Sequence, residues 1–155
     1  MARARVLIVE DERQTVDELR DHLELHGYET EVALTVPVSV SIVEERMMDL
    51  AIIGEDVHEV SGLDILNKLK ELAPGLKILM MTAQKSKRYQ ASLVRSGAQG
   101  VLTQPLDKLE SLKLIKGVLK RPEVRVKKRK RVKVKVKKKV RVRAKAKKRS
   151  KVKKR

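Results

Sequence analysis

The chain has 155 residues, with 38 Lys and Arg against 20 Asp and Glu, for a formal net charge of +18. It contains no cysteine, which excludes disulfide bonds, thiol nucleophiles and Cys-ligated metal centres. No apolar run reaches the ~18 residues of a membrane-spanning helix, and acidic residues follow the N-terminus too early for a secretion signal. We therefore expect a cytoplasmic protein.

The charge is distributed unevenly along the chain. Residues 1–120 hold 16 basic and 19 acidic side chains, whereas residues 121–155 hold 22 basic side chains and one acid, Glu123. The first segment is long enough to bury one hydrophobic core. The second has too few and too small apolar residues to offset chain entropy and like-charge repulsion. We predict a folded domain at 1–120 and a low-complexity basic tail at 121–155, disordered unless bound.

Short aliphatic runs alternate with helical patterns in the first half of the domain. Residues 5–9 predict a buried strand that ends at Glu10 and Asp11. Apolar residues at helical spacing predict a helix over 14–26, which Gly27 ends as a left-handed residue. The patterns that follow predict a strand over 28–34, a helix over 36–48 and a third buried strand over 50–53.

The same alternation continues in the second half, where the last helix is capped by Asp107. The predicted elements are a helix over 63–72, a strand over 77–81, a helix over 85–96, a strand over 100–102 and a helix ending near 120. Five aliphatic strands alternating with five helices predict an α/β fold with a five-stranded, doubly wound parallel sheet. Sites in such sheets form beyond the carboxyl ends of the strands. We expect the polar residues there to converge: Glu10, Asp11, Glu55, Asp56, Thr82 and Gln104.

Several segments resemble, in order and spacing, the receiver domain of bacterial response regulators, the CheY-like family of two-component (phosphorelay) signalling. The segments are VLIVEDE, GYETEVA, DLAIIG, SGLDIL, ILMMTA and GAQGVLTQPL. The resemblance covers residues 4–120 and implies a flavodoxin-like (βα)5 fold. The sequence offers no Ser-His-Asp set and no glycine-rich phosphate loop, so we predict a signalling module and not an enzyme.

The resemblance also implies a site. In that family an acidic pair after the first strand and a carboxylate ending the third hold Mg²⁺, and the third-strand carboxylate accepts a phosphoryl group. The acidic pair matches at Glu10 and Asp11, and the hydroxyl that grips the phosphoryl group matches at Thr82. The acceptor position is Gly54, which has no side chain.

Position 104 also differs from the family pattern, in a way that fits the change at position 54. The lysine that precedes the proline of the fifth-strand motif is replaced by Gln104, next to the matching Pro105. An amide is neutral, so it cannot pair with a phosphoryl group as a cation does. Both changes predict a pseudo-receiver that keeps the fold and has lost phosphotransfer.

Two alternatives stay open at this site. Asp56 lies two residues beyond Gly54 and is the fallback acceptor, which Lys85 or Lys87 would then support. Glu10, Asp11 and Asp56 form a residual acidic pocket that either binds Mg²⁺ weakly or only caps and solvates a loop. We assign no confident metal site and no other cofactor.

Histidines and methionines receive structural roles. His22 and His26 are four residues apart, a chelating spacing, but without a third ligand we interpret them as surface or boundary residues. His58 is expected to face solvent. The methionines are expected to fill the core: Met47, Met48, Met80 and Met81.

The tail alternates valine with lysine or arginine. Binding to a polyanion would relieve the repulsion between these basic side chains. We favour nucleic acid, then an acidic protein surface, and an anionic membrane last. Tyr28 and Tyr89 are the only aromatics, and no helix-turn-helix is present, so we expect no sequence readout. The candidate nucleic-acid-binding residues are Lys127, Lys128, Arg129, Lys130, Arg131, Lys133, Lys135, Lys137, Lys138, Lys139, Arg141, Arg143, Lys145, Lys147, Lys148 and Arg149.

Protein partners are implied by the resemblance as well. The family's usual docking surface combines the fourth helix, the fifth strand and the fifth helix. Here that surface would be cationic, through Lys87, Arg88, Arg95 and Lys113. We predict an adaptor that docks a protein on this surface, with a homodimer and association with the nucleoid as further options.

Overall fold

The structure, a computed structural model, describes residues 3–120, which lie within one compact unit, Met1–Arg121. The predicted tail and every nucleic-acid-binding residue assigned to it lie outside the described residues. The domain division at residue 120 and the state of the tail therefore stay predictions. Within the described part, no helix is long and apolar enough to cross a membrane.

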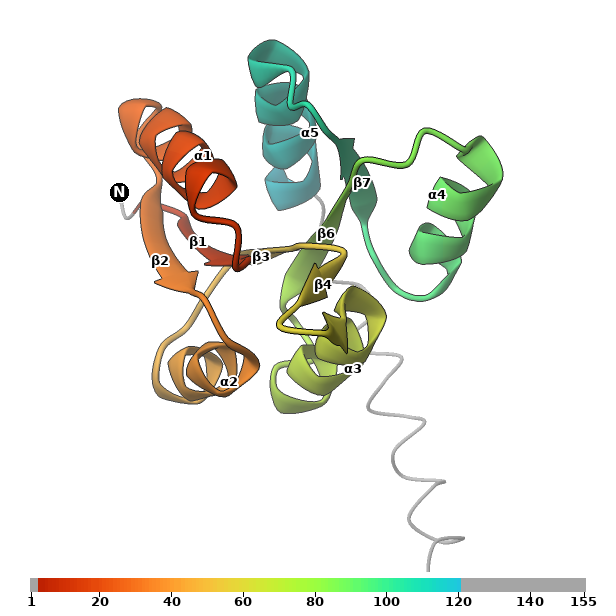
Figure 1. Ribbon diagram of the computed structural model, residues 1–155. Helices are drawn as coiled ribbons and strands as arrows, with labels where there is room; N and C mark the ends of the chain where they lie inside the picture. The colour runs from red at the N-terminus through yellow and green to blue at the C-terminus, as the bar shows by residue number, and fades with distance from the viewer. Residues whose placement is uncertain (1–2, 121–155) are drawn as a thin grey trace, which may run out of the picture. The chain divides into compact units, whose positions relative to one another are not determined.

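Five parallel strands form the central sheet in the order β2-β1-β3-β6-β7 (Figure 1). They are β1 Arg5–Val9, β2 Glu29–Ala33, β3 Leu50–Ile53, β6 Lys77–Thr82 and β7 Gly100–Thr103. The strand order reverses between β1 and β3, so the carboxyl ends of these two strands mark the switch point where sites form in such sheets. The predicted α/β fold with a doubly wound, five-stranded sheet is confirmed.

Helices cover both faces of the sheet (Figure 1). The helices are α1 Arg13–Leu25, α2 Val36–Glu45, α3 Gly62–Leu72, α4 Lys87–Arg95 and α5 Lys108–Lys120. Side chains of β1 alternate between two cores: Leu7 and Val9 pack with α2, α3 and α4, while Val6 and Ile8 pack with α1 and α5. Burying each such side chain contributes about 1.5–3 kcal/mol, which explains why the strands read as unbroken aliphatic runs.

The predicted end signals of the helices are present. Gly27 follows α1 with a φ of 91°, the left-handed conformation that ends a helix. The Asp107 carboxylate accepts a hydrogen bond from the Glu110 backbone N–H at 2.9 Å, as an N-cap does. Glu12 caps α1, because its carboxylate accepts from the Thr15 N–H at 2.8 Å.

Some boundaries differ from the prediction. Helix α2 ends at Glu45 instead of residue 48, and α4 begins at Lys87 instead of residue 85, after its N-cap Ser86. Met80 and Met81 are buried and Met48 packs against the core, but Met47 is 83% exposed because it lies beyond the shortened helix. The expectation that Met47 fills the core is wrong.

A small antiparallel hairpin lies between β3 and α3, in a segment for which the sequence predicted no strand or helix. Its strands are β4 Asp56–Val57 and β5 Val60–Ser61, paired Asp56 to Ser61 and Val57 to Val60. His58 and Glu59 both have positive φ, 48° and 67°, as in the tight two-residue turn that suits a twisted hairpin. The hairpin lies directly beyond the carboxyl end of β3, so it positions residues of the candidate site.

Candidate functional site

Glu10 is the first residue beyond β1 and is only 9% exposed. Its Oε2 accepts hydrogen bonds from the backbone N–H groups of Asp11 and Glu12, at 3.1 and 3.0 Å. Burial raises the pKa of Glu10, and the neighbouring charge of Asp11 adds to this, while the two backbone N–H groups act in the opposite direction. Glu10 is thus a buried carboxyl group held by the backbone of its own loop.

Gly54 lies beside Glu10, at the end of β3. Its N–H donates to the Val9 carbonyl at 2.9 Å, which extends the pairing of β3 with β1 by one residue. A Cβ atom built on Gly54 would lie 3.0 Å from Cδ of Glu10 and closer still to its Oε1. The Glu10 carboxylate therefore occupies the space into which a side chain at position 54 would extend.

Asp11 is held by the hairpin. Its Oδ2 accepts a hydrogen bond from the backbone N–H of His58 at 2.7 Å, and the His58 ring Nδ1 lies 3.8 Å away. The His58 side chain is 60% exposed, which confirms the expected solvent-facing position. The turn of positive-φ residues aims the His58 N–H at Asp11, so the hairpin ties down the second member of the acidic pair.

Asp56 is placed apart from the acidic pair. It is exposed in β4, and residues 3–120 contain no group of three His, Asp or Glu side chains that could hold a metal ion. The structure therefore brings Glu10 and Asp11 together and leaves Asp56 outside their pocket. The reason is the hairpin, which turns the chain away after Glu55.

Glu55 takes the position facing the end of β6. Its Oε2 accepts hydrogen bonds from the Gln84 amide at 2.5 Å and from the Tyr89 hydroxyl at 3.1 Å. Burial raises the pKa of Tyr89, and the hydrogen bond and negative charge of Glu55 add to this. One carboxylate thus connects the end of β3 to the β6–α4 loop and to α4.

Thr82 and Gln104 meet at the ends of β6 and β7. Thr82 is fully buried, its Oγ1 accepts from the Gln84 N–H at 3.0 Å, and its carbonyl accepts from the Gln104 N–H at 2.8 Å. The Gln104–Pro105 peptide is cis. Gln90 also reaches this loop, because its amide donates to the Gln84 carbonyl at 2.7 Å and to the Thr103 hydroxyl at 3.1 Å. The sequence predicted Thr82 and Gln104 at this edge, but no local pattern indicated that Gln84, Tyr89 and Gln90 would join them.

The residues present do not fit the magnesium site that the resemblance implies. Oε2 of Glu10 is already bound to two N–H groups, Oδ2 of Asp11 accepts from His58, and Gly54 offers no ligand. Mg²⁺ requires several oxygen ligands in a near-octahedral arrangement. Of the two alternatives for the acidic pair, the geometry favours loop capping over weak metal binding.

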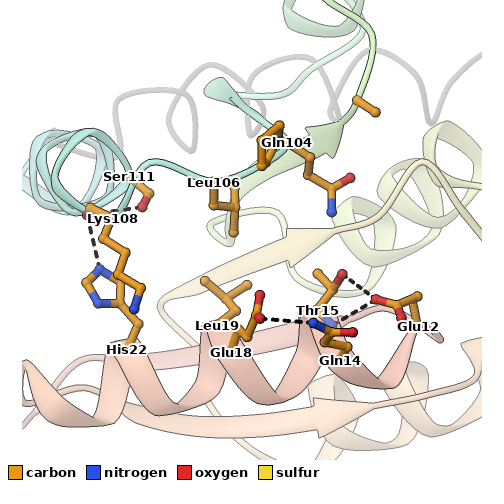
Figure 2. A pocket seen from close by; sticks show the side chains of 12 residues that line it. Glu12, Gln14, Thr15, Glu18, Leu19, His22, Gln104, Leu106, Lys108 and Ser111 are labelled. Carbon is orange, nitrogen blue, oxygen red and sulfur yellow. Dashed lines mark hydrogen bonds between the residues drawn. The ribbon is translucent and has the colours of Figure 1, made fainter.

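A cavity of about 570 Å³ lies next to this site, between α1 and the β7–α5 loop. Figure 2 shows Gln104 pointing from the end of β7 toward the first turn of α1, where Gln14 and Thr15 lie.

The two histidines lie near the C-terminal end of α1. The His22 ring Nε2 lies 3.1 Å from the Lys108 carbonyl. His22 is half-buried and its ring packs edge-on against the exposed His26, at 4.8 Å between centroids. Both histidines are thus surface or boundary residues, as predicted.

Comparison with known proteins places this geometry in a family. The family profile described as response regulator receiver domain matches residues 6–116. An uncharacterised 14.6 kDa protein of Leptolyngbya boryana is 29% identical over 117 residues, which cover 74% of this chain and 89% of that protein. The photosynthetic apparatus regulatory protein RegA of Rhodobacter capsulatus is 28% identical over 102 residues, and the match covers 66% of this chain but only 55% of RegA.

A solved structure agrees with these sequence matches. The CheY-like response regulator receiver domain protein of Methanospirillum hungatei is 29% identical in sequence and superposes with a TM-score of 0.70. That match covers 76% of this chain and 94% of the solved one. Because the profile matches residues 6–116, which are most of the chain, this chain belongs to the response regulator receiver domain family.

Proposed function

We propose that this chain is a receiver module that works without phosphoryl transfer, by docking a protein partner and by binding nucleic acid through residues 121–155. The observation that carries the proposal is position 54, where the acceptor carboxylate of the family is replaced by a glycine and the Glu10 carboxylate lies against it. Gln104 supports it, because a neutral amide stands where a cation would pair with the phosphoryl group. The module is an adaptor and not an enzyme.

The docking surface we propose comprises α4, β7 and α5. Its exposed basic side chains include Lys87, Arg88, Arg95 and Lys113, and they outnumber the acidic Glu110 of α5. A cavity of about 620 Å³ opens there, lined by the charged residues Lys85, Asp107, Glu110 and Lys113. Apolar Val101 and Leu114 also line it. The excess of basic side chains on α4 and α5 together with these apolar residues suits an acidic segment with an apolar anchor, because complementary charge steers the encounter and apolar burial stabilises the complex.

Residues 121–155 supply the second half of the function. Their 22 basic side chains against one acid provide the cations that neutralise phosphates, which needs no defined fold. With no aromatic residue in this segment, binding is expected to be independent of sequence. The proposal places the protein in the cytoplasm, in association with the nucleoid.

The loss of phosphotransfer is tested by mass. The full chain is incubated with Mg²⁺ and a small-molecule phosphoryl donor, and the intact mass is measured. We expect no adduct of about 80 Da, the mass of a phosphoryl group. An acid-stable, base-labile adduct that disappears in Asp56→Asn would instead establish the alternative, a response regulator that uses Asp56.

The nucleic-acid function is tested by truncation. The full chain and a chain ending at Lys120 are titrated onto duplex DNA, single strands and anionic vesicles over a series of salt concentrations. If ~10 phosphates are engaged, the log–log salt slope of the full chain on duplex DNA is about −9. Unchanged DNA affinity after truncation would remove nucleic acid from the function, and stronger binding to vesicles would assign the segment to membranes.

The docking surface is tested with the chain ending at Lys120, so that the basic segment does not compete. A short acidic peptide with one leucine is titrated, and shifts of backbone amide NMR signals are mapped. Shifts concentrated on α4, β7 and α5, and lost in Arg88→Glu, support the surface. Shifts concentrated on α1 or α2 would contradict it.

A further inference from the structure

Two leucines on the outer surface of α1 and α5 are largely exposed. Leu25, the last residue of α1, is 80% exposed, and Leu109, in the first turn of α5, is 64% exposed. The two helices cover the same face of the sheet (Figure 1), and both leucines line a groove of about 640 Å³ between them, together with Leu112. We call this surface the α1–α5 face. Apolar side chains gathered at a groove are typical of a surface that a partner covers.

The two sides of the groove carry opposite charge. Helix α1 has four acidic and two basic residues, whereas α5 has four lysines and one glutamate. At the groove itself, Glu18 and Asp21 lie on the α1 side and Lys108 on the α5 side. Among the described residues, the ion pairs of α1 stay within that helix, where Arg20 pairs with Asp17 and Asp21. The opposite charges of α1 and α5 are therefore exposed side by side and not paired with each other.

A face with both signs of charge is complementary to itself. A basic segment would be repelled by Lys108, and an acidic segment by Glu18 and Asp21, so either partner would match only half of the face. A second copy of the chain matches both halves. A two-fold axis that runs along the groove places α1 of each copy on α5 of the other, so that each acidic side meets a basic one and Leu25 is covered near Leu109 of the other copy.

We propose that the α1–α5 face is a two-fold interface between two copies of this chain. Its apolar centre is formed by Leu25, Leu109 and Leu112, and the charged residues surround this centre, as in other protein interfaces. The docking surface of α4, β7 and α5 stays open in such a dimer, because Lys113 and Leu114 line the cavity on that other side of α5. The interface thus adds a second binding surface and does not depend on the loss of phosphotransfer.

The first test compares the self-association of three full-length proteins by sedimentation velocity: the natural chain, Leu25→Glu and Met47→Glu. The salt concentration is ~0.15 M, at which charges farther apart than about 8 Å are screened, so the net charge of +18 opposes association less. We expect the natural chain to dimerise with rising concentration and Leu25→Glu to weaken the dimer by about tenfold or more, because it introduces a charge at the apolar centre.

Met47→Glu is the matched control. Met47 is 83% exposed, so the same charge is added to an equally accessible apolar side chain. It follows α2, which packs on the opposite face of the sheet from α1 and α5. We therefore expect the control to dimerise like the natural chain. Both substitutions are at exposed positions, and circular dichroism confirms that each variant is folded.

The second test exchanges charges across the interface. Asp21→Lys and Lys108→Glu are each expected to weaken the dimer, because like charges then face each other. The double variant D21K/K108E is expected to restore most of the affinity, since it re-creates opposite charges at the same places. The two single variants change the net charge in opposite directions, so weakening by both cannot come from net charge alone.

Four results would overturn the inference. The natural chain staying monomeric up to roughly 100 μM would remove a specific interface of this kind. Equal loss of the dimer in Leu25→Glu and Met47→Glu would trace the effect to added surface charge. A dimer that Leu25→Glu leaves intact but Val94→Glu abolishes would assign self-association to α4, where Val94 is 47% exposed. A double variant weaker than both single variants would contradict the proposed pairing of α1 with α5.

Discussion

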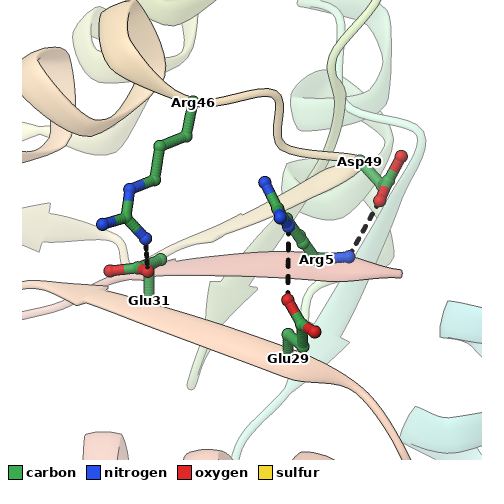
Figure 3. A network of polar contacts seen from close by, with 5 residues as sticks. All are labelled: Arg5, Glu29, Glu31, Arg46 and Asp49. Atoms are coloured by element: carbon green, nitrogen blue, oxygen red, sulfur yellow. Dashed lines mark hydrogen bonds and ion pairs between the residues drawn. The ribbon is translucent and has the colours of Figure 1, made fainter. Parts of the chain in front are cut away.

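The two ends of the sheet differ in the side chains that contact their carboxylates, which are arginines at the amino end and neutral groups at the carboxyl end. At the amino end, Arg5 pairs with Glu29 at 3.2 Å, Arg46 pairs with Glu31, and the Arg5 N–H donates to Asp49 at 2.8 Å (Figure 3). At the carboxyl end, the contacts of Glu10 are backbone N–H groups, and those of Glu55 are the neutral side chains of Gln84 and Tyr89.

The two ends therefore differ in how strongly their stability depends on exact hydrogen-bond geometry. The side chains of Arg5 and Glu29 are 47% and 50% exposed, so water and salt screen their attraction. Glu10 is 9% exposed, and its contribution to the free energy of unfolding depends on its hydrogen bonds from the backbone N–H groups of Asp11 and Glu12. The carboxyl end, where receivers carry out their chemistry, is therefore the end at which single changes should matter.

The largest effect is expected from removing the buried carboxylate. Glu10→Ala leaves the N–H groups of Asp11 and Glu12 without their acceptor, and we expect a loss of about 1–3 kcal/mol in the free energy of unfolding. Urea unfolding at neutral pH measures it. Glu12→Asp, which keeps a capping carboxylate, is the control and should cost far less. A loss of similar size in both variants would mean that the loop, and not the buried group, sets the stability.

The pH dependence should distinguish the same two glutamates. Burial raises the pKa of Glu10, whereas the Thr15 hydroxyl and N–H lower the pKa of Glu12. A raised pKa means that folding favours the protonated form of Glu10, so this pH-dependent contribution is full below the unfolded pKa and is lost as pH rises through the folded one, while the two backbone hydrogen bonds to Oε2 remain at neutral pH. The stability of the natural chain relative to Glu10→Gln should therefore fall as pH rises across this window. For Glu12 the sign is reversed, and its contribution is lost as pH falls through the lowered pKa. Carboxyl NMR titration checks both directions.

A smaller effect is expected at Glu55. Tyr89→Phe removes one hydrogen bond to this carboxylate and should cost about 0.5–1.5 kcal/mol. Glu55→Gln removes its charge, so the pKa of Tyr89 should fall while staying above its ordinary value, because burial remains. Tyr28, whose pKa is raised by burial alone, serves as the internal control, and its pKa should be the same in Glu55→Gln as in the natural chain. Alkaline titration followed by NMR measures the pKa of each tyrosine separately. An unchanged pKa of Tyr89 in Glu55→Gln would contradict the interaction between Glu55 and Tyr89.

The smallest effect belongs to the amino end. Arg46→Ala should lower the free energy of unfolding by about 0.2–1 kcal/mol at low salt, and by less at high salt, because the side chains of Arg46 and Glu31 are 53% and 33% exposed, so solvent and salt screen their attraction. Paired unfolding curves at two salt concentrations measure this. A loss larger than that of Glu10→Ala, or one that salt does not reduce, would reverse the comparison between the two ends.

Much of the fold follows from local patterns. Strand β3 has the predicted bounds, since its four consecutive aliphatic residues lie between Asp49 and Gly54, which mark where the aliphatic run begins and ends. The hairpin escaped prediction because strands of two residues carry no periodicity, and because positive φ at His58 and Glu59 is unusual for residues other than glycine. Met47 was misassigned because a helical pattern does not show where the last turn stops.

The sequence predicted which residues lie at the candidate site but not which contacts their side chains make. The matched positions Glu10, Asp11, Thr82 and Gln104 lie at the carboxyl edge as parallel strands require. That Glu10 turns toward Gly54, and that Glu55 and not Asp56 faces α4, depends on contacts between strands far apart in sequence. Such contacts are set by tertiary packing, which no spacing rule encodes.

The packing of Glu10 against Gly54 also bears on which residues position 54 accepts. A side chain introduced at position 54 meets the carboxylate of Glu10, which has to shift to make room. The Glu10 side chain therefore has to change conformation before a longer side chain at position 54 can be accommodated.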